Sequence, residues 1–214
     1  MTIEPRVRAA AAQDLAVTAA EFHRLGWMWG TSGNLSERLS TDPLAFLVTA
    51  SGRPKGALHE RDMLLVGAGG AALEKWEGRP SAEMPVHERI YRCFDAGAVC
   101  HVHTVMSSVI SECYGDVGGL ELHGLEMLKG FGHATPDVTL TVPIVDNHAD
   151  SVVIADNLER GARAGVPGVL IRNHGLYAWG GTPEQARAHV EVFEFLFSYV
   201  YHRDTLRTAM QRTH

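Results

Sequence analysis

A short apolar stretch near the middle of the chain, Ala98-Val99-Cys100-His101-Val102-His103, gives the first indication of the fold. Its β-branched and small residues are typical of a buried strand. Alternate side chains of a strand share one face, so His101 and His103 point the same way and Cys100 points away. Two imidazoles on one face can bind the same metal ion. The stretch therefore predicts a strand that also carries part of a metal site.

A third histidine follows a second apolar run, Val169-Leu170-Ile171-Arg172-Asn173, as His174 directly before Gly175. Three histidine ligands that leave one coordination position open are typical of catalytic metal sites, and Glu83 offers an oxygen ligand in addition. Because the chain has 12 histidines, core histidines bonded to the backbone remain an alternative. The position of both histidine segments at strand ends favours the metal site. Imidazole suits several divalent transition metals, of which we expect Zn²⁺.

Length and composition limit the classes of protein that fit. At 214 residues and 45% hydrophobic, the chain can bury a full core, and we expect a single domain over residues 1–214. A net charge of −6 and the lack of a basic stripe argue against nucleic acid as a partner. No apolar run is long enough to span a membrane, and no secretory signal is visible. Three cysteines without a C-x-x-C pair suggest reduced thiols, so we expect a cytoplasmic protein.

Apolar periodicity predicts where the helices and strands lie. Helices are expected at residues 7–25, 84–95, 104–113, 122–129, 149–164 and 183–207. Strands are expected at 46–49, 61–66, 98–103, 142–145 and 169–172. This interleaving predicts an α/β class with helices on both faces of one sheet. The last helix carries more apolar residues than one stripe needs, so a subunit interface competes with the core as their explanation.

Two polar loops rich in glycine lie on either side of the first expected strand, at residues 31–34 and 49–52. Glycine lets the backbone approach an anion, and successive N–H groups form an anion-binding nest. Neither loop has the P-loop or the G-x-G-x-x-G pattern, so two ordinary turns remain an alternative. Lys55 adds a positive charge near the second loop, and Ser81 lies two residues before Glu83. Together these features predict a phosphate pocket beside the metal.

Five motifs follow one another along the chain: Gly33-Asn34-Leu35-Ser36, Ser51-Gly52-x-x-Lys55-Gly56-x-Leu58-x-x-x-Asp62, Pro80-Ser81-x-Glu83-x-x-x-His87, Gly97-Ala98-Val99-x-His101-x-His103-Thr104 and Arg172-x-His174-Gly175-Leu176-Tyr177-x-Trp179-Gly180. In this order they resemble the class II aldolase/adducin family, over residues 7–201. The resemblance implies a three-layer α/β/α fold with a central, largely antiparallel sheet. It also implies a homotetramer with active sites near subunit contacts.

The resemblance also implies roles for individual residues. It implies three metal ligands, which are His101, His103 and His174. It implies a substrate phosphate bound by Asn34, Ser51, Gly52 and Ser81. Glu83 falls at the carboxylate position of the family, where aldolases have a metal ligand and base. Some dehydratases of the family lack a carboxylate there, so the role of Glu83 stays open.

Further segments resemble the branch of the family that removes water from a methylthio-substituted pentulose 1-phosphate in methionine salvage. They are residues 95–105, Glu126-Met127-x-Lys129-Gly130, residues 142–147 and residues 193–197. The branch implies a metal-dependent hydro-lyase for a small sugar phosphate, with Glu126 as its acid and base. An aldolase or 4-epimerase for fuculose, rhamnulose or ribulose phosphate is the alternative, which Glu83 favours. A non-catalytic assembly module like the adducin head is a third, against which the intact histidine set argues.

Overall fold

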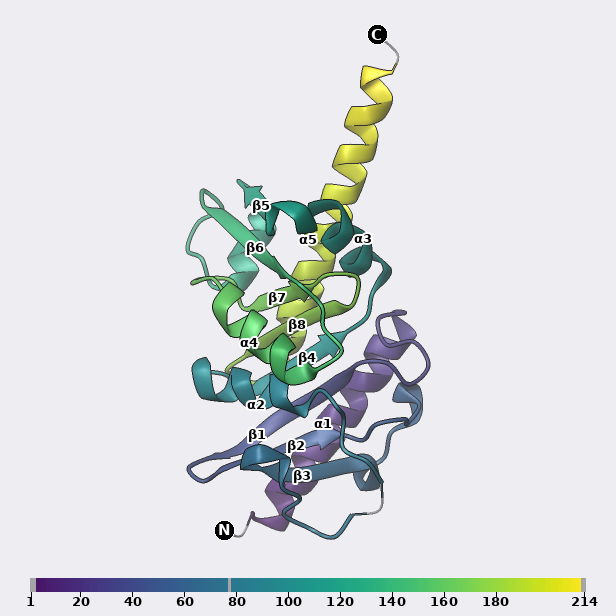
Figure 1. The fold of residues 1–214 in the computed structure, drawn as a ribbon, viewed down its shortest axis with the longest axis vertical. Helices are drawn as coiled ribbons and strands as arrows, with labels where there is room; N and C mark the ends of the chain where they lie inside the picture. The colour runs from purple at the N-terminus through teal and green to yellow at the C-terminus, as the bar shows by residue number, and fades with distance from the viewer. Residues whose placement is uncertain (1–2, 77, 213–214) are drawn as a thin grey trace.

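The strands of the chain form one eight-stranded sheet in the order β3-β2-β1-β4-β8-β7-β6-β5 (Figure 1). The structure is a computed structural model that describes residues 3–76 and 78–212. The strands are β1 (Asn34–Thr41), β2 (Leu44–Thr49), β3 (Met63–Gly67), β4 (Ala98–Val102), β5 (Gly119–His123), β6 (Thr139–Val145), β7 (Gly168–Ile171) and β8 (Gly175–Gly180). Neighbouring strands are antiparallel, except that β6 and β7 are parallel. The expectation of a largely antiparallel sheet is confirmed.

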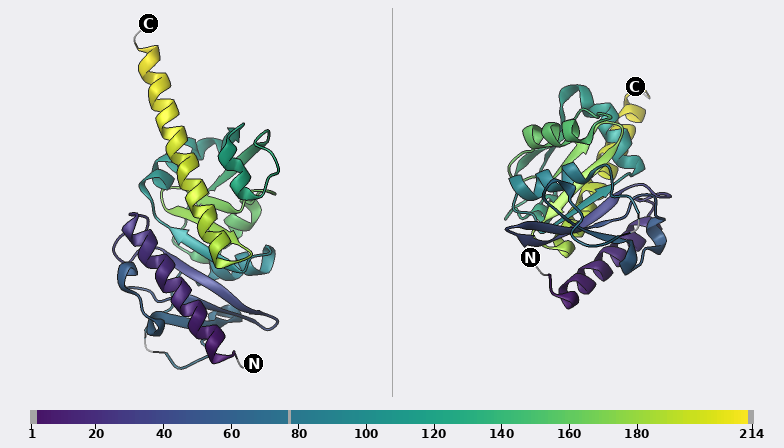
Figure 2. Two further views of the ribbon diagram at one scale, coloured as in Figure 1. Left: turned by 180° about the vertical axis from the view of Figure 1, so that it is seen from behind. Right: turned by 60° about the horizontal axis from the view of Figure 1, so that its bottom comes forward.

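Helices cover both faces of the sheet. They are α1 (Pro5–Arg24), α2 (Met84–Cys93), α3 (Val105–Tyr114), α4 (Ser151–Gly161) and α5 (Pro183–Gln211). Figure 1 shows α2 and α4 in front of the sheet, and the view from behind in Figure 2 shows α1 and α5 across the other face. Two separate apolar cores lie between these layers, one under α1 and α5 and one under α2 and α4. The three-layer α/β/α fold is therefore confirmed.

The expected helix at residues 122–129 is wrong. Residues 119–123 form the edge strand β5, and a short 3-10 helix, η5 (Glu126–Phe131), follows it. In β5 the buried Leu120 and Leu122 alternate with the exposed Glu121 and His123, which is the period of a strand. Gly124 then adopts a φ of 68°, a left-handed conformation that ends the strand and separates it from η5.

The strand β8 lies near the centre of the sheet, between β4 and β7, and the pattern of apolar residues did not predict it. A tight turn of residues 172–174 joins β7 to β8, and Asn173 adopts a left-handed φ of 54° in it. Asparagine tolerates this conformation better than most residues. The turn returns the chain alongside β7 and lays β8 beside β4, where His101 pairs with Tyr177.

The last helix α5 continues well past the body of the protein (Figures 1 and 2). Its core-facing side buries Phe193, Leu196, Phe197 and Val200. Three further aromatic side chains stay exposed, namely Phe195, Tyr199 and Tyr201. The core thus accounts for only part of the apolar density of this helix. Among the described residues, none of the helices has the length and apolarity that crossing a membrane requires.

Candidate metal centre

Three imidazoles and one carboxylate converge beside the centre of the sheet. The Nε2 atoms of His101 and His103 lie 2.8 Å apart. The Oε1 atom of Glu83 lies 2.9 Å from Nε2 of His174 and 3.4 Å from Nε2 of His101. One potential ligand atom from each of the four residues lies within 4.8 Å of the others. The structure therefore brings together the three histidines predicted from the sequence, and Glu83 joins them.

Each of these four residues lies at or near the end of an element. The strand β4 carries His101, and His103 follows its last residue. The turn before β8 carries His174, and Glu83 immediately precedes α2. Gly175 makes this close approach possible, because a Cβ atom there would lie 2.3 Å from the backbone oxygen of Val102. The cluster thus depends on the tight pairing of β4 with β8.

The histidines are oriented by hydrogen bonds on their far nitrogens. Nδ1 of His101 lies 3.0 Å from the backbone oxygen of Leu176, and Nδ1 of His174 lies 3.2 Å from Oδ1 of Asn147. Because both partners are acceptors, each Nδ1 carries the proton and each Nε2 is free to bind a metal ion. The ring of Tyr177 stacks on His101 with 3.9 Å between centroids, which holds that imidazole in plane.

The charge state of the cluster suits a cation. Burial, together with the neighbouring His101 and His174, lowers the pKa of His103 to about 3, so its imidazole is neutral. Burial alone would raise the pKa of the Glu83 carboxyl, but His101 and His174 outweigh it and hold that pKa well below its usual range. Imidazole nitrogens and a carboxylate oxygen are donors that a divalent transition metal prefers. The residues present therefore fit a metal ion.

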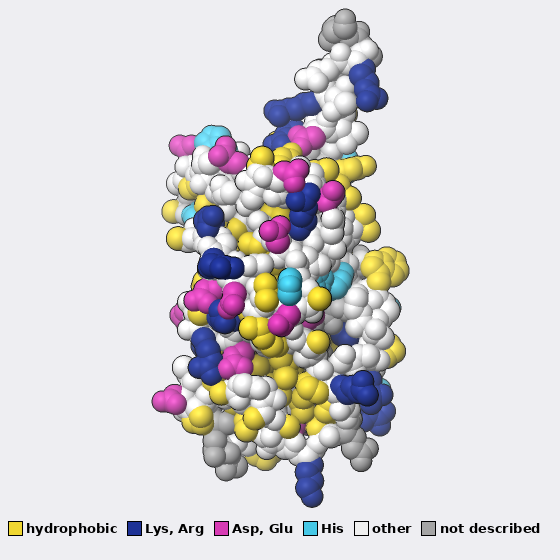
Figure 3. Space-filling view, viewed as in Figure 1, with side chains coloured by type: hydrophobic (Ala, Val, Ile, Leu, Met, Phe, Trp, Pro, Cys, Tyr) yellow, Lys and Arg dark blue, Asp and Glu magenta, His cyan; other side chains and the backbone are white. Residues whose placement is uncertain are grey.

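A cavity of about 320 Å³ opens beside the cluster. Its polar lining comes from the two glycine loops, the start of α2 and the loop before α4, and includes Thr31, Asn34, Ser51, Lys55, Ser81 and His148. Among the predicted phosphate ligands, Asn34, Ser51 and Ser81 line the cavity. Gly52 is exposed and does not line it, although its φ of 69° shapes the loop that carries Ser51. In the space-filling view, histidine side chains reach the surface near the middle of this face (Figure 3).

Lys55 is the one lysine that lines this cavity. It is 1% exposed, and its ammonium donates hydrogen bonds to the backbone oxygens of Thr31 at 2.9 Å and Arg53 at 3.1 Å. These bonds tie the first glycine loop to the second. Burial lowers the pKa of Lys55 to about 8, although the nearby Glu83 opposes this shift. A buried cation between two loops of this kind is suited to an anionic ligand such as phosphate.

Glu126 lies apart from the cluster within one chain. It begins η5, which packs against α5 on the face of the sheet opposite Tyr177 and the histidines. Its carboxylate is largely exposed, pairs with Lys129 at 2.7 Å and does not line the cavity. Within one chain, the structure therefore does not bring this predicted acid and base to the histidines.

Sequence reasoning gave no role to Asn147 or Tyr177, although both orient the histidines. Asn147 lies in a loop whose place beside His174 depends on the parallel pairing of β6 with β7. Tyr177 meets His101 only because β8 pairs with β4. Both contacts are set by strand pairing, which left no local signal in the sequence. The sequence indicated Lys55 as a positive charge near the second glycine loop but did not predict that its side chain is buried.

Comparison with known proteins places this chain in a family. The sequence profile of the family described as Class II Aldolase and Adducin N-terminal domain matches residues 13–201. The chain is 41% identical over 180 residues to a methylthioribulose-1-phosphate dehydratase of Persephonella marina, which covers 84% of each chain. It is 41% identical over 197 residues to a protein of the same name from Geobacillus kaustophilus, covering 92% of this chain and 94% of that one.

A solved structure agrees with the fold. An L-fuculose 1-phosphate aldolase superposes with a TM-score of 0.77 at 22% identity, over 92% of this chain and 88% of that chain. At this level of identity the likeness supports the architecture of the sheet and its helices.

Proposed function

Because the chain belongs to the class II aldolase and adducin family, we propose that it dehydrates 5-methylthioribulose 1-phosphate in a metal-dependent reaction. The product is 2,3-diketo-5-methylthiopentyl 1-phosphate, and the reaction is a step of methionine salvage. The observation that carries the proposal is the histidine and glutamate cluster beside a cavity lined by Lys55, Ser51 and Ser81. The similarity to dehydratases over most of the chain supports this substrate.

The cavity residues would hold the phosphate of the substrate. The buried ammonium of Lys55 supplies positive charge, and the hydroxyls of Ser51 and Ser81 supply hydrogen bonds. Oγ of Ser81 already accepts hydrogen bonds from Asn34 Nδ2 and from the backbone N–H of Glu83, so its own proton is free for the phosphate. Binding of the phosphate at one end places the sugar carbons beside the cluster.

The chemistry requires the loss of a proton and of a hydroxyl group. A divalent ion bound by His101, His103 and His174 would supply Lewis-acid polarisation of the substrate carbonyl. The carboxylate of Glu126 accepts the proton from C3 and returns it to the C4 hydroxyl, which leaves as water. The resulting enol becomes the diketone when a proton moves to C4. Glu83, whose Oε1 lies 2.9 Å from Nε2 of His174, would add a carboxylate oxygen to the ligands of the ion.

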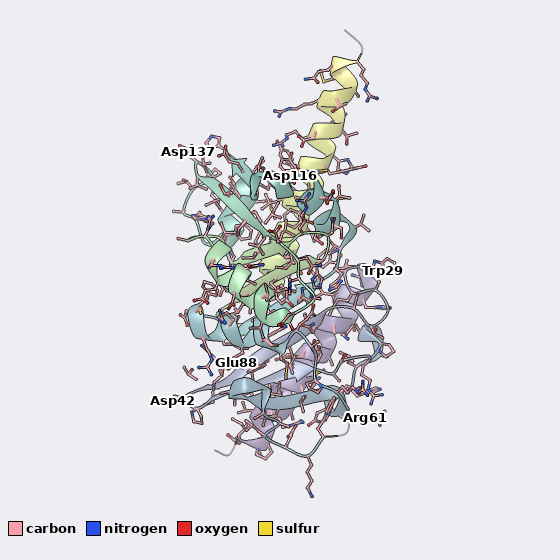
Figure 4. The ribbon with its side chains drawn as sticks, viewed as in Figure 1. Trp29, Asp42, Arg61, Glu88, Asp116 and Asp137 are labelled. Carbon is pink, nitrogen blue, oxygen red and sulfur yellow. The ribbon has the colours of Figure 1, made fainter. Side chains whose placement is uncertain are left out.

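We infer that Glu126 acts on the site of a neighbouring subunit in a homotetramer. Within one chain it lies on the opposite face of the sheet from the histidines. Two exposed apolar side chains close in sequence to the cavity lining support a protein contact there. Val105 follows the lining residue His103 by two positions. Trp29, labelled in Figure 4, precedes the lining residue Thr31 by two positions. The free thiols of Cys93, Cys100 and Cys113 fit a reducing cytoplasmic compartment, which completes the proposal.

The first test follows the substrate directly. Zinc-loaded protein is incubated with 5-methylthioribulose 1-phosphate, and the products are measured by mass spectrometry. We expect the loss of one water from the substrate, which stops when a chelator removes the metal. An unchanged substrate mass in the presence of bound metal would contradict the proposed reaction.

The variant Glu126→Gln tests the acid and base. We expect its turnover to fall by about 10²- to 10⁴-fold, the usual contribution of a positioned acid or base. Its metal content should be unchanged, because Glu126 is not among the converging ligands. Metal analysis and steady-state kinetics check both statements. Full activity in Glu126→Gln would remove this residue from the mechanism.

One observation favours a second candidate, a class II sugar-phosphate aldolase or 4-epimerase. Glu83 reaches the histidines at 2.9 Å, which is the arrangement expected where a carboxylate acts as ligand or base. The same assay with fuculose, rhamnulose and ribulose phosphates separates the two. Cleavage or epimerisation of one of these without water loss from the methylthio sugar would favour the second candidate.

A further inference from the structure

A chain of buried hydrogen bonds leads from Glu83 into the protein core. The side-chain amide of Asn34 lies 2.5 Å from Oε2 of Glu83 through its Nδ2 atom. Its Oδ1 atom contacts Nε2 of His87. Nδ1 of His87 lies 2.6 Å from Oγ of Ser36, which in turn lies 2.6 Å from the hydroxyl of Tyr91. We call these four residues, Asn34, Ser36, His87 and Tyr91, the relay.

The relay is almost completely removed from solvent. His87 and Ser36 have no exposed surface, and Asn34 and Tyr91 are at most 5% exposed. Polar groups at such depth destabilise a fold unless each finds its partner. The proposed reaction gives no direct role to His87, Ser36 or Tyr91. Their burial behind Glu83 therefore calls for a separate explanation.

One arrangement of protons satisfies every member of the relay. Asn34 donates from Nδ2 to Oε2 of Glu83, so the amide oxygen is the atom that faces His87. Burial lowers the pKa of His87 to about 3, which leaves that imidazole neutral with a single proton. This proton must lie on Nε2, because Nε2 faces the Asn34 oxygen. Nδ1 then accepts from Ser36, and Ser36 accepts from Tyr91.

The arrangement divides the two oxygens of Glu83 between different partners. Oε2 accepts from Asn34, while Oε1 is the atom that faces His101 and His174. When a hydrogen bond holds one oxygen of a carboxylate, the other oxygen is the one that can turn toward a metal ion. The Asn34 amide could otherwise rotate by half a turn and place its oxygen against Glu83, which would repel it.

We propose that His87 is a positioning residue, which fixes the Asn34 amide and thereby aims Oε1 of Glu83 at the three histidines. Ser36 and Tyr91 act behind it by holding the Nε2–H tautomer of His87. The inference concerns the geometry of the cluster and rests on the proposed function only in that Glu83 contributes to a metal centre. Its tests need no substrate.

The affinity of the metal-free protein for Zn²⁺, measured by competition with a chromophoric chelator, tests the proposal. We expect His87→Leu to weaken Zn²⁺ binding by about 10- to 100-fold, the usual effect of losing a group that orients a ligand. His87→Gln should keep most of the affinity, because its amide can still donate to Asn34 from the place of Nε2. Equal affinity in His87→Leu and the unchanged protein would overturn the proposal, as would equal losses in both variants.

A matched control separates positioning from general loss of packing. His189 on α5 is comparably buried, at 4% exposed, and its Nδ1 donates to the backbone oxygen of Trp179, away from the cluster. We expect His189→Leu to lower the melting temperature while leaving Zn²⁺ affinity unchanged. A loss of Zn²⁺ affinity in His189→Leu as large as in His87→Leu would show that only packing matters.

The tautomer of His87 provides a readout that does not depend on His87→Leu folding. In ¹⁵N NMR of histidine-labelled, metal-free protein, the signals that disappear in His87→Gln belong to His87. We expect them to report a neutral ring protonated on Nε2, and a ring protonated on Nδ1 would overturn the relay. Failure of the dehydration assay with these results intact would remove the proposed reaction and leave the positioning role standing.

Discussion

At the scale of a single side chain, burial changes the chemistry of Lys55 in the cavity beside the cluster. We expect Lys55→Met to raise KM about 10- to 100-fold, as for the loss of a charged hydrogen bond of about 1.5–3 kcal/mol, without changing Zn²⁺ affinity. Because burial lowers the pKa of Lys55 to about 8, its charge is present below that pH and is lost above it. The value of kcat/KM should therefore fall as the pH rises through about 8. Rate profiles of both proteins between pH 6 and pH 9.5, about 1.5–2 units either side of that pKa, provide the measurement.

The variant supplies the control for this pH dependence. Lys55→Met has no group of this pKa, so the alkaline fall in kcat/KM should be absent from its profile. The same fall in both proteins would assign it to another group.

Several site residues could be predicted because the sequence pattern that marks them lies within a few neighbouring residues. His101 and His103 share a strand face through a period of two, and His174 follows an apolar run. The relay was not predictable in this way, because Asn34 and His87 meet only through the packing of α2 on the sheet. Pairings between residues 53 positions apart leave no periodic trace in one sequence.

The contact between α3 and α5 carries a buried carboxyl group that makes stability depend on pH. Burial raises the pKa of Glu194 to about 7, although the hydroxyl of Thr104, the N-cap of α3, donates to it at 2.6 Å. The unfolded chain ionises this group near pH 4.5, so the folded protein binds more protons between the two values. The contribution of Glu194 to stability is therefore lost as the pH rises from about 4.5 to 7.

Glu194→Gln removes this penalty and keeps an oxygen for Thr104. We expect the variant to exceed the unchanged protein in free energy of unfolding at pH 8 by up to about 3 kcal/mol, and much less at pH 5. Urea denaturation of both proteins at the two pH values checks this. A gain that is the same at both values would show that the charge of Glu194 is not its cause.

The predictions of helices and strands were correct where a single element carries its own capping or periodicity signal. Residues 183–207 were expected as a helix because Thr182 and Pro183 mark its start, and the structure confirms this. The helix predicted at residues 122–129 overlapped the end of the edge strand β5, because few apolar residues fit both periods over so short a run. The strand β8 was missed because buried strands of six residues with glycine at both ends resemble loops.

The placement of Glu126 predicts how several copies of the chain share their sites. If its carboxylate serves a neighbouring subunit, a mixture of Glu126→Gln and His103→Ala subunits should recover activity that neither variant has alone. When the two assemble at random in equal amounts, about a quarter of the sites combine intact ligands with an intact Glu126. The recovered rate is measured after joint refolding, with sedimentation to establish four copies of the 23.3 kDa chain.

Separately folded variants that are mixed without refolding serve as the control for activity that arises without joint assembly. No recovery after joint refolding, in assemblies shown to contain both variants, would place Glu126 and the histidines of a site in the same subunit or exclude Glu126 from the reaction.

The tight pairing of β4 with β8 has a consequence for folding during synthesis on the ribosome. The four converging side chains span positions 83 to 174, and the last of them stands just before β8. A ribosome must therefore release the chain beyond residue 180 before β8 can lie beside β4 and close the cluster. Until then the earlier histidines are separate side chains on an incomplete sheet, so the complete cluster cannot form before β8 pairs with β4.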